Sequence, residues 1–548
     1  MKSLNIKSHF PENYTPRIPQ ESIVSQVADA LQSDTKFIII QAPTGSGKSH
    51  IAATIANAAS LPPQRFCDLV NTHEIYKKDY VSDTYIYEKE VLKMPPFGCV
   101  ALTVTKALQD QYTEIFDNCT ALKGKQNYVC EVDGDFDCDL APCLLSSNLL
   151  NDCWNTKKCH FHNARDAALQ SKFGALNYSV FLNMPDFLKR KQIIVCDEAS
   201  ELEDELVKHY SCEVNYKTIN VDEMGISKLT TTDPFIAHRW LSDLLVKVKL
   251  KVDAYVAILK TSKKASKRKL LGDVTRARIY KNLYDKIRLI LCNWSTAEFI
   301  ITIDGTSTKF VPLYVDTLAQ NFYKHNDHII LMSGTIINHK LFAETLGIKD
   351  YKYIEVDSEF AADKSPIYSM SKVKLTYKNV DVEMPKLMHT VKELCDHYKD
   401  QKGIIHTHTN KITKIVQAKF GKDKRFIFRE PGVTNEVVLR EHFLRDDASI
   451  IVSPSLGFGT DLCDEFGRFS IVLKTPYLPL GDERIKKLAK KNQGWYEMKA
   501  MINLVQMCGR TTRSKDDFSD TYILDGTAVQ LIKKNVKHLP IWFRNRLA

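Results

Sequence analysis

A glycine-containing loop between an apolar run and a helical pattern could bind phosphate. In "KFIIIQAPTGSGKSH", residues 36–50, the apolar run is Phe37 to Ile40, and the amphipathic stretch "IAATIANAA" follows the loop. Glycines let backbone N–H groups approach phosphate oxygens, a lysine reaches the β- and γ-phosphates, and a serine hydroxyl can bind Mg²⁺. The predicted ATP-phosphate site consists of Thr44, Gly45, Ser46, Gly47, Lys48 and Ser49. The pattern begins with Ala42 where Gly is usual, and a glycine-rich turn without a nucleotide is the alternative.

Two adjacent carboxylates end a second apolar run. "KQIIVCDEAS", residues 191–200, predicts a buried strand from Ile193 to Cys196 that leads into Asp197 and Glu198. A P-loop lies at the carboxyl edge of a parallel sheet, so an acid at the end of another strand can share its Mg²⁺. Asp197 is predicted to bind this metal through water, and Glu198 to polarise the attacking water. A strand that ends in an acidic turn is the alternative.

Two arginines near the carboxyl end could supply positive charge on the far side of a γ-phosphate, as an arginine finger does. "NLVQMCGRTTRS", residues 503–514, contains Gln506, Gly509, Arg510 and Arg513. Arg510 and Arg513 lie three residues apart, so on a helix both would project from one face. Gln506, Arg510 and Arg513 are therefore candidate catalytic residues, with a solvated basic face as the alternative.

The motifs occur in the order known from superfamily two helicases, which the chain resembles. "APTGSGKS", "DEAS" and "QMCGRTTR" are similar to that family's nucleotide motifs, and "ALTVTKALQDQY", "LMSGTI" and "SPSLGFGTDL" to its motifs Ia, III and V. A cysteine-rich stretch stands between "APTGSGKS" and "DEAS", where the XPD and DinG family inserts an iron–sulfur domain. The flanks "LKGKQNYVC" and "CHFHNARDAALQSKFGALNYSVFLN" resemble that family's borders. The resemblance spans nearly the whole chain.

The resemblance implies an α/β fold with two RecA-like P-loop lobes, each a parallel sheet with flanking helices. An iron–sulfur domain and a helical arch would be inserted into the first lobe. The expected division is first lobe 1–118, 165–215 and 301–337, iron–sulfur insertion 119–164, arch 216–300, and second lobe 338–548.

The resemblance also implies an activity. An ATP-dependent DNA helicase of DNA repair or replication, moving 5′ to 3′ on single-stranded and forked DNA, is expected. The resemblance implies that Arg17 and Gln20 in "TPRIPQ" recognise adenine. It also implies that Gly459 and Asp461 belong to the nucleotide site. Small hydroxyls suit phosphate contacts, so Thr103 and Thr105, before Lys106 and Gln111, are expected at the nucleic acid backbone, with Thr335 and Thr460 coupling that contact to ATP.

Two positions depart from the family's pattern. Ser200 stands where the family usually has His, which affects how γ-phosphate sensing passes between the lobes. Phe458 stands where motif V usually has an acidic residue.

Five cysteines and two histidines lie in "VCEVDGDFDCDLAPCLLSSNLLNDCWNTKKCHFH", residues 129–162. Four thiolates can hold a [4Fe–4S] cluster, and the same residue type can bind zinc. The predicted iron–sulfur ligands are Cys130, Cys143, Cys153 and Cys159, of which the first and last border the family-like flanks. Cys138 is the alternate to Cys143, because neighbouring carboxylates would raise its thiol pKa. A zinc site that uses Cys159 with His160 or His162 is the competing interpretation.

Composition bounds the class of protein. A length of 548 residues exceeds one domain, and 44% hydrophobic with 26% charged residues is ordinary for a globular chain. The 76 Lys and Arg against 66 Asp and Glu give a net charge of +10, which suits a polyanion without requiring one. The start "MKSLNIKSHFPENYTPRIPQ" lacks the apolar core of a signal peptide, and no run of ~18 apolar residues occurs. A monomeric cytoplasmic or nucleoid-associated protein with reduced thiols and no membrane contact is expected.

Helical and strand patterns fill the rest of the chain. Apolar residues recur every four positions at Ile279, Leu283, Ile287 and Leu291, and Arg276, Arg278, Lys281 and Arg288 lie between them. This spacing predicts an amphipathic helix with a basic outer face. "TSKKASKRKLLG" before it would bind phosphates or form a solvated loop.

Later segments predict the second lobe. Strands are predicted in "KGIIHTHTN", "SIIVSPSL" and "FSIVLKTPYLPL", and a helix in "PKLMHTVKELCDHYKD". Trp542 and Phe543, near the carboxyl end, are predicted to pack on this lobe rather than stack on a base.

Three functions remain compatible with these residues. The leading hypothesis is the DNA helicase. A translocase that does not separate strands, or one that acts on RNA, is a second, since contacts to the 2′-OH leave no motif. A metal-stapled nucleic-acid binding protein switched by ATP is a third.

Overall fold

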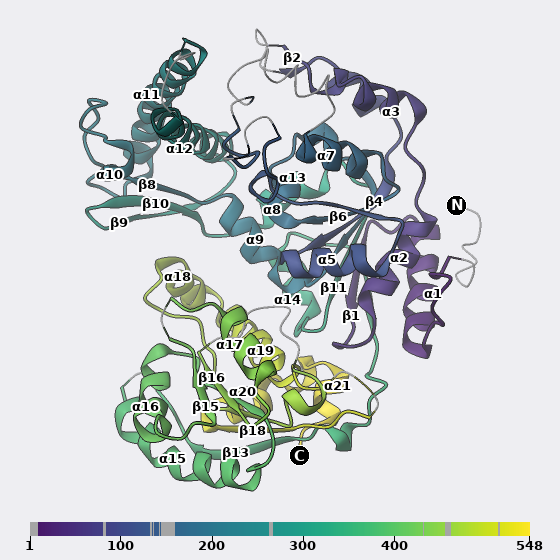
Figure 1. Ribbon diagram of the computed structural model, residues 1–548, viewed down its shortest axis with the longest axis vertical. Helices are drawn as coiled ribbons and strands as arrows, with labels where there is room; N and C mark the ends of the chain where they lie inside the picture. Colours follow the sequence, from purple (N-terminus) through teal and green to yellow (C-terminus); the bar gives the residue numbers. More distant parts are fainter. Residues whose placement is uncertain are drawn as a thin grey trace.

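The computed structural model describes residues 9–79, 84–131, 134, 136–141, 143, 159–261, 267–376, 378–430, 432–454, 462–512, 514 and 516–548. Two α/β lobes lie one above the other, and a pair of long helices extends from the side of the first lobe (Figure 1). Each lobe is built on a parallel sheet, so the predicted fold class is confirmed. None of the described helices combines the length and the apolar composition needed to cross a membrane.

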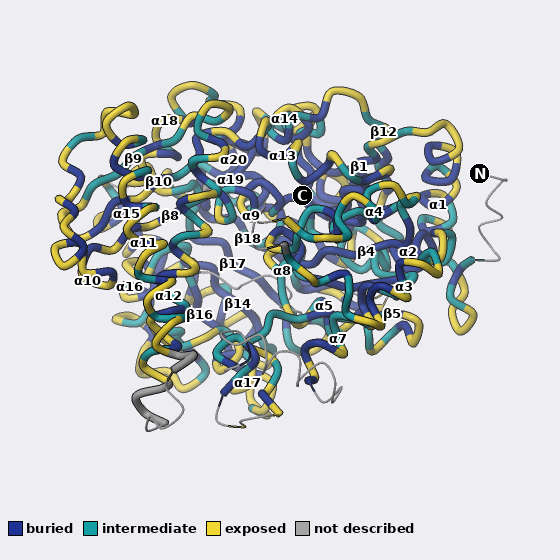
Figure 2. Tube along the Cα trace, turned by 90° about the horizontal axis from the view of Figure 1, so that it is seen from above, coloured by how far each residue is buried: buried dark blue, intermediate teal, exposed yellow. Residues whose placement is uncertain are grey.

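The sheet of the first lobe has seven strands in the order β12-β1-β11-β7-β4-β6-β5, and every neighbouring pair is parallel. The strands are β1 (Phe37–Gln41), β4 (Phe97–Thr103), β5 (Cys119–Leu122), β6 (Phe173–Asn177), β7 (Lys191–Cys196), β11 (His328–Ser333) and β12 (Lys352–Glu355). Helices cover both faces of such a sheet, so its strands are near-continuous apolar runs. The strands form much of the buried interior in Figure 2.

Two groups of helices cover this sheet. One face packs on α1 (Ile18–Gln32), α2 (Lys48–Ala58) and α5 (Lys106–Ile115). The other packs on α7 (His160–Gln170), α8 (Tyr178–Leu182), α9 (Leu202–His209), α13 (Asp316–Tyr323) and α14 (His339–Thr345). Peripheral elements are α3 (Gln64–Asn71), α4 (Glu88–Lys93), β2 (Lys78–Asp79) and β3 (Thr84–Tyr85).

The first lobe continues past the expected boundary. Residues 338 onward were assigned to the second lobe, but β12 pairs in parallel with β1, the strand before the P-loop. This part of the prediction is wrong because "LMSGTI" marks the last motif of the lobe and not its last strand. The first sheet therefore ends at Glu355.

The helical insertion stands on a small antiparallel sheet of order β8-β10-β9. Its elements are β8 (Cys212–Asn215), α10 (Tyr216–Ile219), α11 (Pro234–Thr261), α12 (Lys267–Cys292), β9 (Phe299–Ile303) and β10 (Ser307–Pro312). The predicted amphipathic helix lies within α12. The buried face of this helix contains Leu283, Ile287 and Ile290, whereas Leu291 is only half-buried. The helix has 3.6 residues per turn, so residues spaced exactly four apart move gradually away from one face.

The second lobe has six parallel strands in the order β13-β18-β17-β14-β16-β15. The strands are β13 (Ile367–Val373), β14 (Gly403–His406), β15 (Phe426–Phe428), β16 (Ile450–Ser453), β17 (Phe469–Val472) and β18 (Asp520–Asp525). The helices are α15 (Val380–His397), α16 (Asn410–Phe420), α17 (Asn435–Leu444), α18 (Glu483–Lys491), α19 (Gln493–Cys508), α20 (Gly526–Asn535) and α21 (Ile541–Asn545). The three predicted strands are confirmed.

Three differences refine the prediction for this lobe. The predicted helix begins at Val380, ahead of Pro385, with two acidic residues in its first turn that suit a helix N-terminus. Trp542 and Phe543 are 3% and 0% exposed, which confirms packing. Short 3₁₀ turns lie at Glu74–Tyr76, Lys125–Asn127, Asp186–Leu188, Ala199–Glu201, Ala362–Lys364, Asp464–Phe466 and Val536–His538.

Candidate active site

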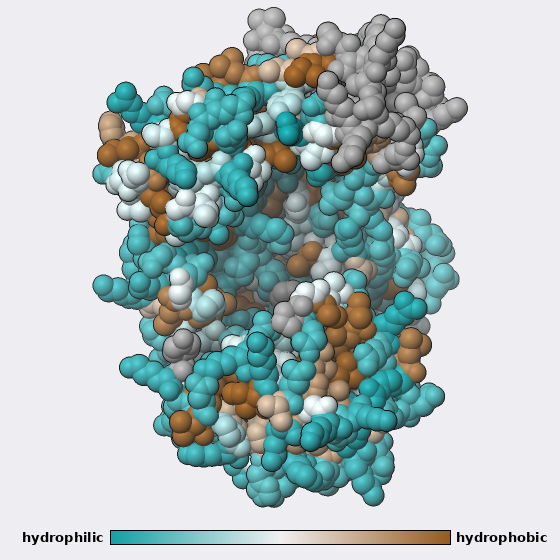
Figure 3. Space-filling model, turned by 60° about the vertical axis from the view of Figure 1, so that its left-hand side comes forward, coloured by the Kyte–Doolittle hydropathy of each residue, from teal (hydrophilic) through white to brown (hydrophobic). Residues whose placement is uncertain are grey.

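A cavity of about 380 Å³ lies between the two lobes. On the face drawn in Figure 3, the molecular surface is hollowed between the upper and lower halves of the molecule. Lobe 1 contributes the P-loop and the two carboxylates, and lobe 2 contributes residues of α19, the turn after it and α21. Its lining includes Thr44, Gly45, Gly47, Lys48, Ser49, Asp197, Glu198, Thr335, Gln506, Arg510 and Trp542.

The P-loop has the backbone conformation that its glycines permit. Gly45 and Gly47 have φ of 82° and 74°, in the left-handed region where a Cβ is strained. A Cβ at Gly47 would also meet the Gln20 side chain at 2.1 Å. Helix α2 begins at Lys48, so its free N–H groups and positive dipole end face the cavity. The Ser46 hydroxyl is buried without a hydrogen-bond partner among the described residues, which fits a loop shaped to take an anion.

Arg17 and Gln20 lie directly against this loop. The Arg17 guanidinium donates to the carbonyl of Gly45 at 2.9 Å, and the Gln20 amide donates to the carbonyl of Gly47 at 3.4 Å. The Gln20 carbonyl in turn accepts from the Arg17 backbone at 2.9 Å. Both residues are therefore placed where they set the shape of the P-loop, beside the cavity rather than in its lining.

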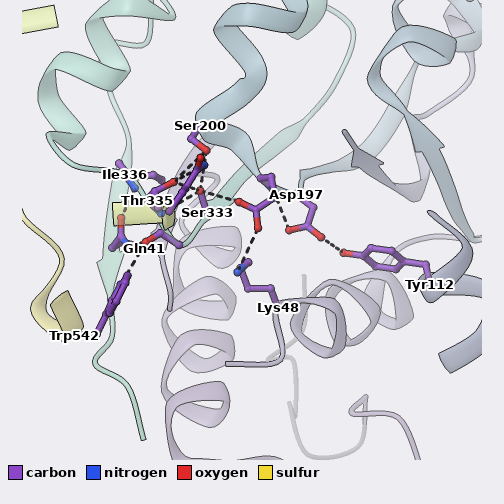
Figure 4. Close-up of polar contacts among 12 residues, drawn as sticks. Gln41, Lys48, Tyr112, Asp197, Ser200, Ser333, Thr335, Ile336 and Trp542 are labelled. Atoms are coloured by element: carbon purple, nitrogen blue, oxygen red, sulfur yellow. Dashed lines mark hydrogen bonds and ion pairs between the residues drawn. The ribbon is translucent and has the colours of Figure 1, made fainter. Parts of the chain in front are cut away.

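The carboxylates end β7, opposite the P-loop. Lys48 Nζ lies 3.8 Å from Glu198 Oε1, and Tyr112 donates to Asp197 Oδ2 at 3.1 Å (Figure 4). Burial, and next the charge of Glu198, raise the pKa of Asp197 to about 6, although Lys48 opposes this. Glu198 has φ 50°, a conformation that is sparsely populated for residues with a Cβ and persists where contacts fix it.

Three hydroxyl groups, those of Ser333, Ser200 and Thr335, lie close together beside the carboxylates (Figure 4). Ser333 donates to Glu198 Oε2 at 3.2 Å, and its oxygen lies 3.1 Å from that of Ser200. Thr335 donates to Ser200 at 3.3 Å and accepts from Gln506 Nε2 at 3.3 Å. Ser200 is thus one member of a continuous path from Glu198 to α19.

Arg510 lies beyond the end of the helix on which it was expected. α19 ends at Cys508, and Arg510 follows in a turn that lines the cavity. The expectation of one shared helix face is wrong because the helix stops at Gly509, its C-cap. Arg513 lies outside the described residues, as do Gly459 and Asp461.

A buried ionic cluster joins the lobes next to this site. Glu203 on α9 accepts from Arg484 at 2.8 Å and from the indole of Trp495 at 3.1 Å, and it lies 3.0 Å from Lys499. Arg484 also donates to the carbonyl of Pro312 at 2.9 Å. Burial favours the neutral acid, but the charges of Lys499 and Arg484 hold the pKa of Glu203 below its usual value. α9 follows Glu198, and α19 leads to Arg510, so the cluster links the two elements that carry opposite sides of the cavity.

Four of the five clustered cysteines are described. Cys130, Cys138, Cys143 and Cys159 are 4%, 5%, 8% and 9% exposed. The thiol of Cys138 lies within hydrogen-bond reach of that of Cys159, while Cys130 and Cys143 share a small apolar cluster. Within the described residues, no three His, Cys, Asp or Glu side chains are grouped as a metal site, and Cys153 lies outside them.

The environment of Cys138 differs from the expected one. Burial, and next the thiol of Cys159, raise its pKa to about 12. The expected direction is confirmed, but the carboxylates proposed as its cause are not its main source. Of the two histidines considered for zinc, His160 is exposed and pairs with Glu131 at 2.6 Å, whereas His162 is buried.

One residue expected at nucleic acid is fully buried. Thr103 is 0% exposed and donates to the carbonyl of Thr105. Thr105 is half-buried, and its side chain caps α5. For Thr103, contact with a DNA backbone is excluded by burial.

Several residues of the site were not predicted. Tyr112 was part of a quoted motif, but its bond to Asp197 has no sequence signal. Gln41 does have one, because it is a polar residue at the end of the otherwise apolar strand β1. Its side chain is 0% exposed and holds the motif III loop through Gly334 and Ile336 (Figure 4).

Comparisons with known sequences match the two ends of the chain. A profile described as helicase C-terminal domain matches residues 404–546, and one described as type III restriction enzyme, res subunit, matches residues 13–136. The regulator of telomere elongation helicase 1 homolog of Caenorhabditis elegans is 29% identical over 106 residues, which cover 16% of this chain and 10% of that protein. The protein of the same description from Caenorhabditis briggsae is 28% identical over 106 residues, which again cover 16% of this chain and 10% of that protein. The match thus spans about a tenth of these curated relatives.

Solved structures match the whole fold. A structure described as XPD helicase has a TM-score of 0.60 at 16% identity and covers 96% of this chain and 98% of its own. An apo XPD structure has a TM-score of 0.56 at 16% identity, covering 94% and 98%. Xpd4 of S. tokodaii has a TM-score of 0.53 at 15% identity, covering 94% and 97%.

Proposed function

We propose that this chain, which resembles superfamily two helicases of the XPD type over nearly its whole length, is an ATP-dependent DNA helicase. The observation that carries the proposal is the single cavity to which one lobe contributes Lys48, Asp197 and Glu198 and the other Gln506 and Arg510. A nucleotide bound there would touch both lobes at once. Its hydrolysis would therefore change the contact between them.

Each side chain has a proposed role in this reaction. The P-loop N–H groups and Lys48 would bind the phosphates, and Ser49 and Asp197 would hold Mg²⁺. Glu198 orients and polarises the attacking water. Arg510 lines the cavity from the second lobe and would stabilise the charge that develops on the γ-phosphate, and Arg513 is proposed to assist it.

The lobes move a DNA strand through alternating closure. Bound ATP would draw Gln506 and Arg510 toward the P-loop. The hydrogen bonds through Thr335, Ser200 and Ser333 would then transmit this movement to Glu198. Hydrolysis releases the contact. Repeated closure would advance the lobes along single-stranded or forked DNA 5′ to 3′, with the chain acting as a monomer in the cytoplasm or nucleoid.

The cysteine-rich segment is proposed to hold a [4Fe–4S] cluster. Four described thiols are buried in two neighbouring groups, with Cys153 as a fifth candidate, and thiolate sulfur is the donor such clusters require. Cys130, Cys143, Cys153 and Cys159 would hold it, with Cys138 competing for one place. Bound there, the cluster would cross-link segments that lack a large core of their own. Residues 119–164 would then form a firm edge where the duplex parts.

Strand displacement tests the proposed function. Forked substrates with a 5′ or a 3′ single-stranded arm are given to the protein with Mg²⁺ and ATP, and ATP hydrolysis is followed in parallel. Unwinding that requires the 5′ arm supports the proposal. DNA-stimulated hydrolysis without strand separation would support a translocase instead, and hydrolysis unaffected by DNA would contradict both.

A further inference from the structure

The indole of Trp542 lies at a boundary between the two lobes. Trp542 belongs to α21 near the end of the chain, is 3% exposed and lines the same cavity as Lys48 and Glu198. Its Nε1–H donates to the carbonyl oxygen of Gly334 at 3.4 Å (Figure 4). A side chain of the second lobe thus touches both the nucleotide cavity and a loop of the first lobe.

The carbonyl oxygen of Gly334 accepts hydrogen bonds from both lobes. Its carbonyl oxygen also accepts from Gln41 Nε2 at 2.6 Å, and Gln41 is fixed at the end of β1. Gly334 lies between Ser333 and Thr335, the two residues that bind Glu198 and Gln506. This carbonyl therefore lies on the backbone between the two hydroxyl residues that link Glu198 to α19.

The ring itself is fixed to the second lobe. A Cβ at Gly509 would come within 3.2 Å of the indole, so the ring packs directly on the backbone beside Arg510. The Arg546 guanidinium lies 5.2 Å from the ring centroid, and the Arg546 carbonyl accepts from Ile367 of β13 at 2.7 Å. When the lobes move relative to each other, the indole moves with the second lobe while Gln41 stays with the first.

We infer that Trp542 is a positioning residue that carries the state of the nucleotide cavity to the motif III loop. The inference rests on the proposed ATPase function. On closure the indole N–H and Gln41 hold the Gly334 carbonyl together, which sets Ser333 against Glu198. On opening only Gln41 holds it, and the carboxylate loses its alignment for hydrolysis.

Tryptophan emission provides the first test. The chain has five tryptophans, and the non-hydrolysable ATP analogue AMP-PNP with Mg²⁺ is added to the full protein and to Trp542→Phe. The phenylalanine keeps an aromatic ring in the cavity wall and removes only the N–H and part of the ring. We expect most of the nucleotide-dependent emission change to disappear in the variant. A change that persists at full size in Trp542→Phe would overturn the inference.

Steady-state kinetics separate positioning from binding. Trp542→Phe should lower kcat about fivefold, since one hydrogen bond is lost in the active alignment, and leave KM for ATP within about twofold. Gly509→Ala is a second variant in which the new Cβ displaces the ring while Trp542 remains, and it should lower kcat in the same way. Asn545→Ala, an exposed contact of α21 with Asp357, is the control and should keep the wild-type kcat.

The outcomes distinguish the two hypotheses. If the unaltered protein hydrolyses ATP and both Trp542→Phe and Gly509→Ala keep its kcat, the role of Trp542 is wrong and the proposed function stands. If the unaltered protein does not hydrolyse ATP, the proposed function is wrong, and this inference with it.

Discussion

The carboxylate of Glu203 and the guanidinium of Arg484 lie 2.8 Å apart and join the two lobes where both side chains are buried, at 6% and 7% exposure. Their charges are satisfied further by Lys499, Trp495 and a backbone carbonyl. The lobes of this protein are therefore joined by a buried ionic contact, in addition to the chain that connects them.

Glu203→Ala should lower the free energy of unfolding by about 3–5 kcal/mol, because it leaves two buried cations without their shared partner. The matched control is Glu205→Ala on the same helix, whose partner Lys208 is 74% exposed, and which should cost under about 1 kcal/mol. Urea unfolding midpoints measure both. Equal losses in the two variants would show that the cluster does not stabilise the junction.

Lys48→Ala should reduce ATP hydrolysis to background and leave DNA binding intact, because Lys48 lies in the cavity, where its proposed role is to bind the phosphates of ATP. Lys36→Ala, an exposed lysine just before β1, is the control and should retain full activity. Phosphate release and fluorescence anisotropy of labelled single-stranded DNA are the measurements. Hydrolysis at the parent rate in Lys48→Ala would contradict the assignment of the P-loop.

Thr335→Val should lower DNA-stimulated ATP hydrolysis about five- to tenfold at unchanged ATP affinity, since valine keeps the shape and removes the hydroxyl that Gln506 and Ser200 share. Thr345→Val removes a hydroxyl that bonds only within its own helix and serves as the control. Stopped-flow phosphate release and binding of a fluorescent ATP analogue separate rate from affinity. The same loss in both variants would mean that the path between the lobes has no special role.

Lys191→Met should stabilise the protein at neutral pH. Burial lowers the pKa of Lys191 to about 8 from its ordinary value of 10.5, so the folded state disfavours the charged form. Burial of the charged lysine therefore lowers the free energy of unfolding by its full amount below pH 8, and this loss is relieved as the pH rises toward 10.5. Each unit of difference between the folded and unfolded pKa corresponds to about 1.4 kcal/mol. The gain from methionine should therefore be largest near pH 7 and shrink toward pH 10. Thermal unfolding midpoints across this range test it, and a gain that is independent of pH would contradict the assigned cause.

Serine substitutions should identify the cluster ligands. After anaerobic purification, Cys153→Ser and Cys159→Ser should lose most iron and acid-labile sulfide, and only one of Cys138→Ser and Cys143→Ser should do so. Cys67→Ser, outside the cysteine-rich segment, is the control and should retain both. Zinc in place of iron in the unaltered protein would contradict the iron–sulfur assignment.

The sequence was most informative where the chemistry is contiguous along the chain. The P-loop and the Asp197–Glu198 pair each lie within a few residues of the strand that positions them, so strand, loop and site could be predicted together. The buried strands of both lobes were predictable for the same reason, since each is a short apolar run between polar turns.

Contacts between distant segments could not be predicted. Glu203 and Arg484 are 281 positions apart, and nothing in "LEDELVKH" or "ERIKKLAKK" distinguishes them from exposed ion-pairing residues. Trp542 was expected to pack on its own lobe, but its hydrogen bond to the other lobe depends on how the lobes meet. β12 was missed because its short run of residues carries no motif. Its partner strand β1 lies far away in the sequence, near the start of the chain.

β12 has a consequence for how the molecule bears mechanical load. The chain leaves the first lobe through this strand, which is paired with β1 from Ile38 to Gln41, and then runs to β13 of the second lobe. Tension pulling the lobes apart would reach β12 before any other strand of the first sheet and would act as shear on its hydrogen bonds with β1. Because β1 ends at the P-loop, such a force would act one strand away from the phosphate-binding loop.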